Sequence, residues 1–94
     1  MRSDDALYGY LAAQFADADL LGQTDEQAAV DGISAAKQAA YRKVLTQGRA
    51  VLALSPFPWQ RVGDYANRVF ADEAEAHQWL THVMDLLDDA LKKV

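Results

Sequence analysis

The two histidines of this chain, His77 and His82, are its best candidates for metal ligands. Two ligands on one helix share a face when they are three or four positions apart. These two are five positions apart, which turns them about 140° away from each other around a helix. The chain contains no cysteine, so thiolate zinc sites, disulfides and thiol nucleophiles are excluded. We therefore expect no metal site and no cofactor.

The carboxylates are explained by helix capping better than by acid–base catalysis. A catalytic carboxylate needs an apolar pocket that raises its pKa. The cluster of Asp85, Asp88 and Asp89 is instead typical of a solvated helix face, and no glycine-rich phosphate loop or serine–histidine–acid motif is present. We therefore expect no enzyme activity. Most other acids fall where helices are expected to start: Asp4, Asp5, Asp25, Glu26, Asp72, Glu73 and Glu75.

The segment 57–70 has residues of the types that dominate molecular recognition. It contains four aromatic residues and two arginines within fourteen positions: Phe57, Trp59, Arg61, Tyr65, Arg68 and Phe70. Two interpretations stay open: the rings close the open end of a helix bundle, or they anchor a partner, since Trp, Tyr and Arg dominate binding hot spots.

Hydrophobic periodicity predicts that helices position these residues. Apolar residues recur at spacings of three and four over residues 4–16, 33–54, 59–70 and 72–94. Thr24 with Gln27 predicts a capping box at the start of a helix that Gly32 splits into a short and a long part. Asp72 with Glu75 predicts a second box, and Pro58 is expected to be the first residue of its helix. No strand pattern competes, so the prediction is an all-α single domain over residues 1–94, a compact bundle of four to five helices.

The net charge of −5 is unevenly distributed along the chain. Residues 1–31 contain seven acids and one base, residues 32–71 one acid and six bases, and residues 72–94 six acids and two bases. Either oppositely charged helices pack side by side and pair at their edges, or one acidic face is reserved for a partner. An acidic surface is a poor match for nucleic acid or anionic membrane and a good match for a basic protein.

The apolar runs are short. The longest, residues 50–54, is far below the ~20 residues that span a bilayer. The first residues are acidic and are not followed by the apolar stretch of a secretory signal. We therefore expect no membrane partner and a cytoplasmic location, which also suits a chain without cysteine.

Both ends of the chain show a characteristic order of helix ends, acids and aromatic residues. Near the N-terminus an aromatic-ended helix is followed by an acidic connection and an acidic helix start: residues 7–15, Asp17, Asp19, Gly22 and Glu26. Near the C-terminus residues 69–80 combine an aromatic residue, an aspartate cap, a Glu-Ala pair and a Trp-Leu pair. In these segments, roughly half of the chain, the sequence resembles the bacterial contact-dependent growth-inhibition immunity proteins. The resemblance implies a cytosolic protein that binds the C-terminal toxin domain of a delivered effector.

The leading interpretation is thus an immunity protein that neutralises a cognate toxin domain by covering a basic active-site surface. The alternative is a small helical adaptor or a homodimeric structural protein that uses the small residues Ala36, Ala40 and Gly48; a homo-oligomer is left open but not favoured. A third interpretation, a small-ligand or enzyme role, would need a concave pocket near Trp59 and Arg68. The residues expected to bind the partner are Asp17, Asp19, Asp25, Glu26, Trp59, Arg68, Glu73, Asp85 and Asp88.

Overall fold

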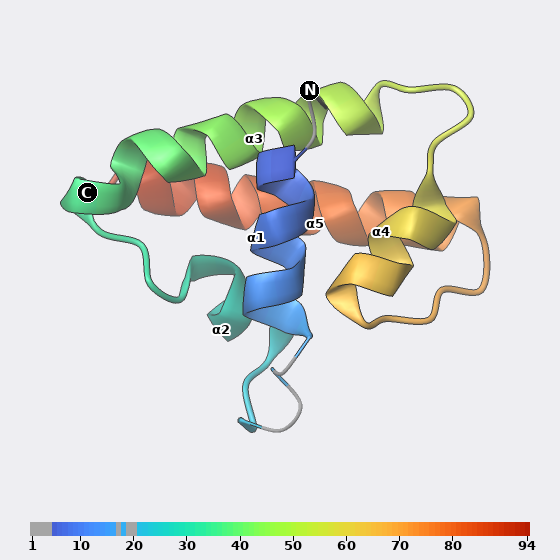
Figure 1. Ribbon diagram of the computed structural model, residues 1–94, viewed down its shortest axis with the longest axis horizontal. Coiled ribbons are helices and arrows are strands. Elements are labelled where there is room, and N and C mark those ends of the chain that lie inside the picture. The colour runs from blue at the N-terminus through green and yellow to red at the C-terminus, as the bar shows by residue number, and fades with distance from the viewer. Residues whose placement is uncertain (1–4, 17, 19–20) are drawn as a thin grey trace.

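The computed structural model describes residues 5–16, 18 and 21–94 (Figure 1). In this part of the chain all regular structure is helical, which confirms the predicted all-α bundle of four to five helices. The elements are α1 (Asp5–Phe15), α2 (Asp25–Val30), the 3-10 turn η1 (Ala35–Lys37), α3 (Gln38–Leu52), α4 (Trp59–Ala66) and α5 (Glu73–Leu91).

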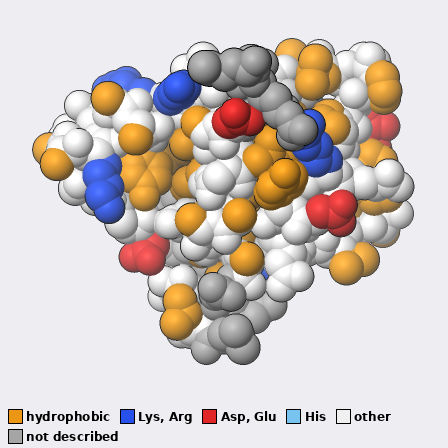
Figure 2. All heavy atoms as spheres, viewed as in Figure 1, with side chains coloured by type: hydrophobic (Ala, Val, Ile, Leu, Met, Phe, Trp, Pro, Cys, Tyr) orange, Lys and Arg blue, Asp and Glu red, His pale blue; other side chains and the backbone are white. Residues whose placement is uncertain are grey.

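The long helices α3 and α5 form the base of the fold. They run side by side in opposite directions, and α1 crosses this pair in front (Figure 1). The shorter helices α2 and α4 lie on either side of α1, and both also pack against α5. The face that α1 forms shows hydrophobic side chains and scattered charges of both signs, with no continuous acidic area (Figure 2).

The core fills the space between α1 and the α3–α5 pair and consists of aliphatic and aromatic side chains. Among the described residues no charged side chain is buried, and the buried Tyr10 hydroxyl donates a hydrogen bond to the Ala29 carbonyl oxygen. Burying one large aliphatic or aromatic side chain stabilises a fold by roughly 1.5–3 kcal/mol. The largest of the fully buried side chains come from α1, α4 and α5, and Met84 is the one among them that the sequence pattern did not predict: Leu7, Leu11, Phe15, Val62, Leu80, Val83, Met84, Leu87 and Leu91.

The N-terminal caps of α2 and α5 lie where the sequence predicted them. The Thr24 hydroxyl accepts a hydrogen bond from the Gln27 amide at 3.1 Å, and the Gln27 side chain accepts one from the Thr24 amide at 2.9 Å, so the predicted capping box is confirmed. Asp72 accepts from the Glu75 amide at 2.9 Å. The Glu75 carboxylate, however, accepts from the amide of Ala71 and not from that of Asp72. The second box is therefore only half formed.

The helix α4 starts at Trp59 as predicted, but its predicted end is wrong. Pro58 is the N-cap residue and not the first residue of the helix. The helix ends at Ala66 and not near Phe70, because Asn67 adopts the left-handed conformation with φ 56° and ψ 48°. Its successor Arg68 then donates a backbone hydrogen bond to the Gly63 carbonyl at 2.9 Å. Residues 67–70 therefore leave the helix axis, which lets the Arg68 side chain reach Asp25 of α2.

The region around Gly32 divides as predicted. Gly32 has a φ of +81°, a conformation that L side chains rarely adopt, and it lies between α2 and η1. At the other end, α3 stops at Leu52, two residues before the predicted end. The connection that follows contains a cis peptide bond between Ser55 and Pro56.

Candidate functional site on the charged helix surfaces

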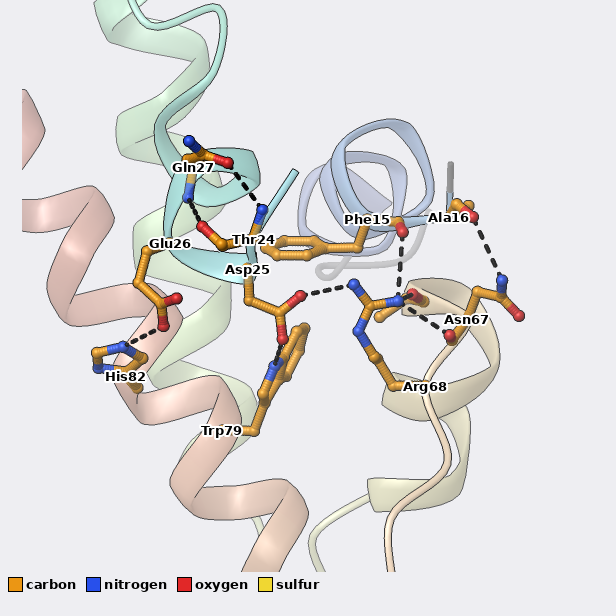
Figure 3. Close-up of polar contacts among 11 residues, drawn as sticks. Phe15, Ala16, Thr24, Asp25, Glu26, Gln27, Asn67, Arg68, Trp79 and His82 are labelled. Carbon is orange, nitrogen blue, oxygen red and sulfur yellow. Dashed lines mark hydrogen bonds and ion pairs between the residues drawn. The ribbon is translucent and has the colours of Figure 1, made fainter. Parts of the chain in front are cut away.

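Asp25, the first residue of α2, lies between a cation and an indole ring (Figure 3). Arg68 Nη2 donates to Asp25 Oδ1 at 2.6 Å, and Trp79 Nε1 donates to Oδ2 at 2.8 Å. Burial alone would raise the pKa of Asp25, but the hydrogen bonds from Arg68 and Trp79 outweigh it, and the pKa lies below its ordinary value of 3.8. Both carboxylate oxygens that were expected to face a partner are thus occupied within the chain.

Arg68 is bonded even more extensively. Its side chain is only 15% exposed. Besides Asp25, its guanidinium group donates to the backbone carbonyls of Phe15, Ala66 and Asn67 at 3.1–3.4 Å (Figure 3). These contacts join the end of α1, the end of α4 and the start of α2. Arg68 therefore holds the fold together at a place where the sequence suggested an anchor for a partner.

The next residue of α2, Glu26, faces the surface of α5. Its Oε2 lies 3.1 Å from His82 Nε2, and both side chains are more than half exposed. Helical spacing alone would allow local pairs on α5, since Glu73 is four positions before His77 and Asp85 is three positions after His82. His77 Nε2 instead lies 3.0 Å from the Leu52 carbonyl oxygen at the end of α3. Both histidines therefore connect α5 to neighbouring helices, which helical spacing alone does not reveal.

The basic helix α3 pairs with the acidic helix α5 along their shared edge. Arg49 Nη2 lies 2.8 Å from Asp85 Oδ1 and 4.0 Å from Asp88 Oδ2. Lys92 Nζ lies 3.7 Å from Asp88 Oδ2, so Asp88 sits between two cations. The interpretation that oppositely charged helices pair at their edges is confirmed here. Asp88 is half-buried, whereas Asp85 stays exposed.

One face of α5 remains exposed along nearly its whole length. We call it the α5 stripe; its members recur at spacings of three and four positions. Three of them carry carboxylates, and α5 contains no lysine or arginine. Of these carboxylates the sequence singled out only Asp85, because Glu75 was assigned to capping and Asp89 to a solvated face. The stripe consists of Glu75, Gln78, His82, Asp85 and Asp89.

The remaining predicted residues are dispersed. The Glu73 side chain is exposed and accepts a hydrogen bond from the Phe57 amide at 3.1 Å. Trp59 is half-buried and packs against the core. Asp17 and Asp19 lie outside the described residues. The structure therefore brings Glu26 and Asp85 to neighbouring surfaces of α2 and α5, and places Glu73 and Trp59 elsewhere.

The surface of the described residues has hollows at each end of the α4–α5 connection. The wider one, about 570 Å³, lies at the start of α5 and is lined by Asp72, Glu73, Ala74, His77 and Gln78. The other, about 220 Å³, lies between α4 and residues 68–70 and includes both Trp59 and Arg68 in its lining. Pockets that hold small-molecule ligands measure about 300–1,000 Å³. A concave site near Trp59 and Arg68 therefore exists, but it is too small for a typical metabolite.

Within residues 5–16, 18 and 21–94, neither a metal cluster nor a membrane-spanning helix is found. Among the described residues no group of three or more histidine, aspartate or glutamate side chains could hold a metal ion. None of the helices in that part of the chain combines the length and apolar character needed to cross a membrane.

Comparisons with protein-family models, with curated proteins and with solved structures find no match to this chain. The charges and contacts of its own residues are therefore the basis for assigning a function.

Proposed function

We propose that this protein is an immunity protein that binds a cognate bacterial toxin domain in the cytoplasm and covers its basic active-site surface. The α5 stripe is the observation that carries the proposal. It presents three carboxylates on the longest helix of the described chain, and Glu26 of α2 lies against it through His82. Carboxylates fixed on a rigid helix match the cations with which a nuclease grips phosphate.

The internal ion pairs of the fold change which residues we assign to the partner. Asp25 and Arg68 are bonded to each other, so both are removed from the proposed contact set. Glu26 and Asp85 remain in it, because exposed pairs such as theirs contribute only about 0–1 kcal/mol and a partner's cation can compete for them. Glu75 and Asp89 are added, since both are exposed and belong to the stripe.

The stripe also suggests how the complex would form. Complementary charge on two surfaces mainly accelerates their encounter, and a preformed helix needs no folding before it docks. The resemblance of both chain ends to contact-dependent growth-inhibition immunity proteins points to the same role.

The alternative, a helical adaptor or homodimer, has less support. Its proposed contact face included Gly48, but a Cβ at that position would lie 2.2 Å from Met84 Sδ of the same chain. Gly48 thus serves the packing of α3 on α5. Ala36 and Ala40 are exposed, but without Gly48 they form too small a face for the proposed helix contact.

Co-expression with the toxin domain encoded next to this gene tests the proposal. We expect growth to be restored and the two purified proteins to form a 1:1 complex in calorimetry. A toxin domain from an unrelated locus serves as the control for specificity. Loss of growth despite expression of the folded protein, together with no heat of binding, would contradict the proposal.

A further inference from the structure

The smaller hollow lies between one face of α4 and the segment that follows it. We call it the α4 hollow. Gly63 allows the two walls to approach closely, since a Cβ there would meet the Arg68 carbonyl oxygen at 2.7 Å and the Phe70 ring at 3.4 Å. The hollow measures about 220 Å³. One wall consists of Trp59, Gln60, Gly63 and Asp64, and the other of Arg68, Val69 and Phe70.

Asp64 supplies a negative charge that no described cation pairs with. It is the only acid in residues 32–71, and it is exposed. Arg68 also lines the hollow, but its guanidinium group is bonded to Asp25 and to three carbonyl oxygens. A carboxylate at the edge of a partly apolar hollow favours a cationic group with an apolar stem.

Among cationic side chains, the other lining residues of the hollow favour arginine over lysine. Trp59 and Phe70 present half-buried rings, and Val69 is 97% exposed at the edge. A guanidinium group is planar, weakly hydrated and suited to stacking on rings. The fold uses the same kind of contact internally. Arg61 lies 4.4 Å from the centre of the Tyr8 ring and 5.9 Å from that of Tyr65, and Arg68 lies 5.9 Å from that of Phe15.

We propose that the α4 hollow receives one arginine side chain of the toxin domain, with the guanidinium group against Trp59 and Phe70 and paired with Asp64. The identity of the partner depends on the function proposed above, whereas the chemistry of the hollow does not. The proposal reverses the expected role of Trp59: its ring forms the wall of a site that receives a residue, and does not itself insert into the partner.

A blocked peptide, acetyl-Ala-Arg-Ala-amide, tests the hollow without any toxin. Titrated into the ¹⁵N-labelled protein to tens of millimolar, it should shift the amide signals of Gly63, Asp64 and Val69 and the indole signal of Trp59 to saturation. The same peptide with citrulline, which keeps the shape but lacks the charge, should bind about fivefold more weakly. Asp64→Asn should weaken arginine-peptide binding about three- to fivefold, whereas Asp31→Asn, an exposed acid outside both the hollow and the α5 stripe, should leave it unchanged.

Three outcomes would overturn the proposal: no saturable shift at the hollow, equal binding of the citrulline peptide, or equal binding by the Asp64→Asn protein. Trp59→Leu, checked for its helical signal by circular dichroism, should also weaken binding; if this variant fails to fold, Asp64→Asn on the surface still decides the question. A negative result with the peptide would leave toxin binding through the α5 stripe standing. Absence of toxin binding alone would leave the arginine site standing.

Discussion

Arg68 and Asp25 are 43 positions apart in the chain, yet Arg68 Nη2 lies 2.6 Å from Asp25 Oδ1. Their side chains are 15% and 30% exposed, so the pair is largely withdrawn from water. Because Trp79 binds the second oxygen of the same carboxylate, the contact ties α2, α5 and the segment after α4 at one point. The most extensive polar contacts of the fold are therefore built from residues that a sequence reader would assign to a partner.

Arg68→Ala should lower the free energy of unfolding by about 2–4 kcal/mol, because it leaves Asp25 and three carbonyl oxygens without their donor. Arg49→Ala is the matched control, since it removes an exposed arginine whose ion pair has a similar length of 2.8 Å. That variant should cost less than about 1 kcal/mol. Urea denaturation measures both. Equal losses would show that Arg68 does not have this special role.

The acid side of the stability profile should depend on Asp25. A carboxyl group whose pKa is lowered by folding stabilises the native state above its ordinary pKa, and this contribution disappears as the pH falls through the folded value. The ordinary value here is 3.8. Wild type should therefore exceed Asp25→Asn in stability at neutral pH, and the difference should shrink below about pH 4. Urea denaturation at a series of pH values would refute this if the difference stayed constant.

Two glycine-to-alanine substitutions should have opposite effects. Gly48→Ala places a methyl group against buried Met84 and should destabilise the protein by about 1–2 kcal/mol. Gly9→Ala on α1 meets nothing within 4 Å and should stabilise it by about 0.5–1 kcal/mol through helix propensity. Thermal unfolding monitored by circular dichroism gives both values. A matching sign in the two variants would argue against the described packing of α3 on α5.

The contact between Gly48 and Met84 can be isolated by a double-mutant cycle. Met84→Ala alone should cost about 2–5 kcal/mol, because it empties part of the core. In that background Gly48→Ala has room for its methyl group and should no longer destabilise the protein. Simple additivity of the two effects would mean that these side chains do not touch.

Neutralising the α5 stripe should slow toxin binding. Glu75→Gln with Asp89→Asn removes two exposed charges while keeping the Arg49–Asp85 pair, and should lower the association rate about tenfold at low salt. Asp5→Asn with Asp31→Asn removes the same net charge elsewhere and should change that rate much less. Stopped-flow measurements at several salt concentrations compare the two variants. If the control variant slows association equally, net charge and not the stripe would be responsible.

The helices and their caps were largely predictable because they depend on neighbours in sequence. Thr24 and Gln27 are three positions apart, and the buried positions of α5 follow one helical period. The early end of α4 also had a local signal, since Asn67 is a residue type that readily takes the left-handed conformation after a helix. That signal was missed because the apolar pattern continued to Phe70.

The availability of each acid for a partner could not be predicted in the same way. Whether a carboxylate is free depends on a polar side chain that folding brings from far away: Glu26 meets His82 from 56 positions along the chain. Asp25 and Asp89 look alike in sequence, yet one is bonded on both oxygens and the other is exposed. The α4 hollow could not be predicted either, since it exists only because residues 68–70 turn back on α4 after Asn67.

The position of α5 in the fold has a consequence for synthesis on the ribosome. This last helix packs against α2, α3 and α4 and supplies core residues from Ala76 to Leu91. As the nascent chain emerges, α1 to α4 have no partner for these surfaces, so the core closes only after residue 91 has left the exit tunnel. Nascent chains that stall before that point should remain sensitive to proteases. Because the α5 stripe lies on this helix, its carboxylates are held in their final arrangement only after the core has closed.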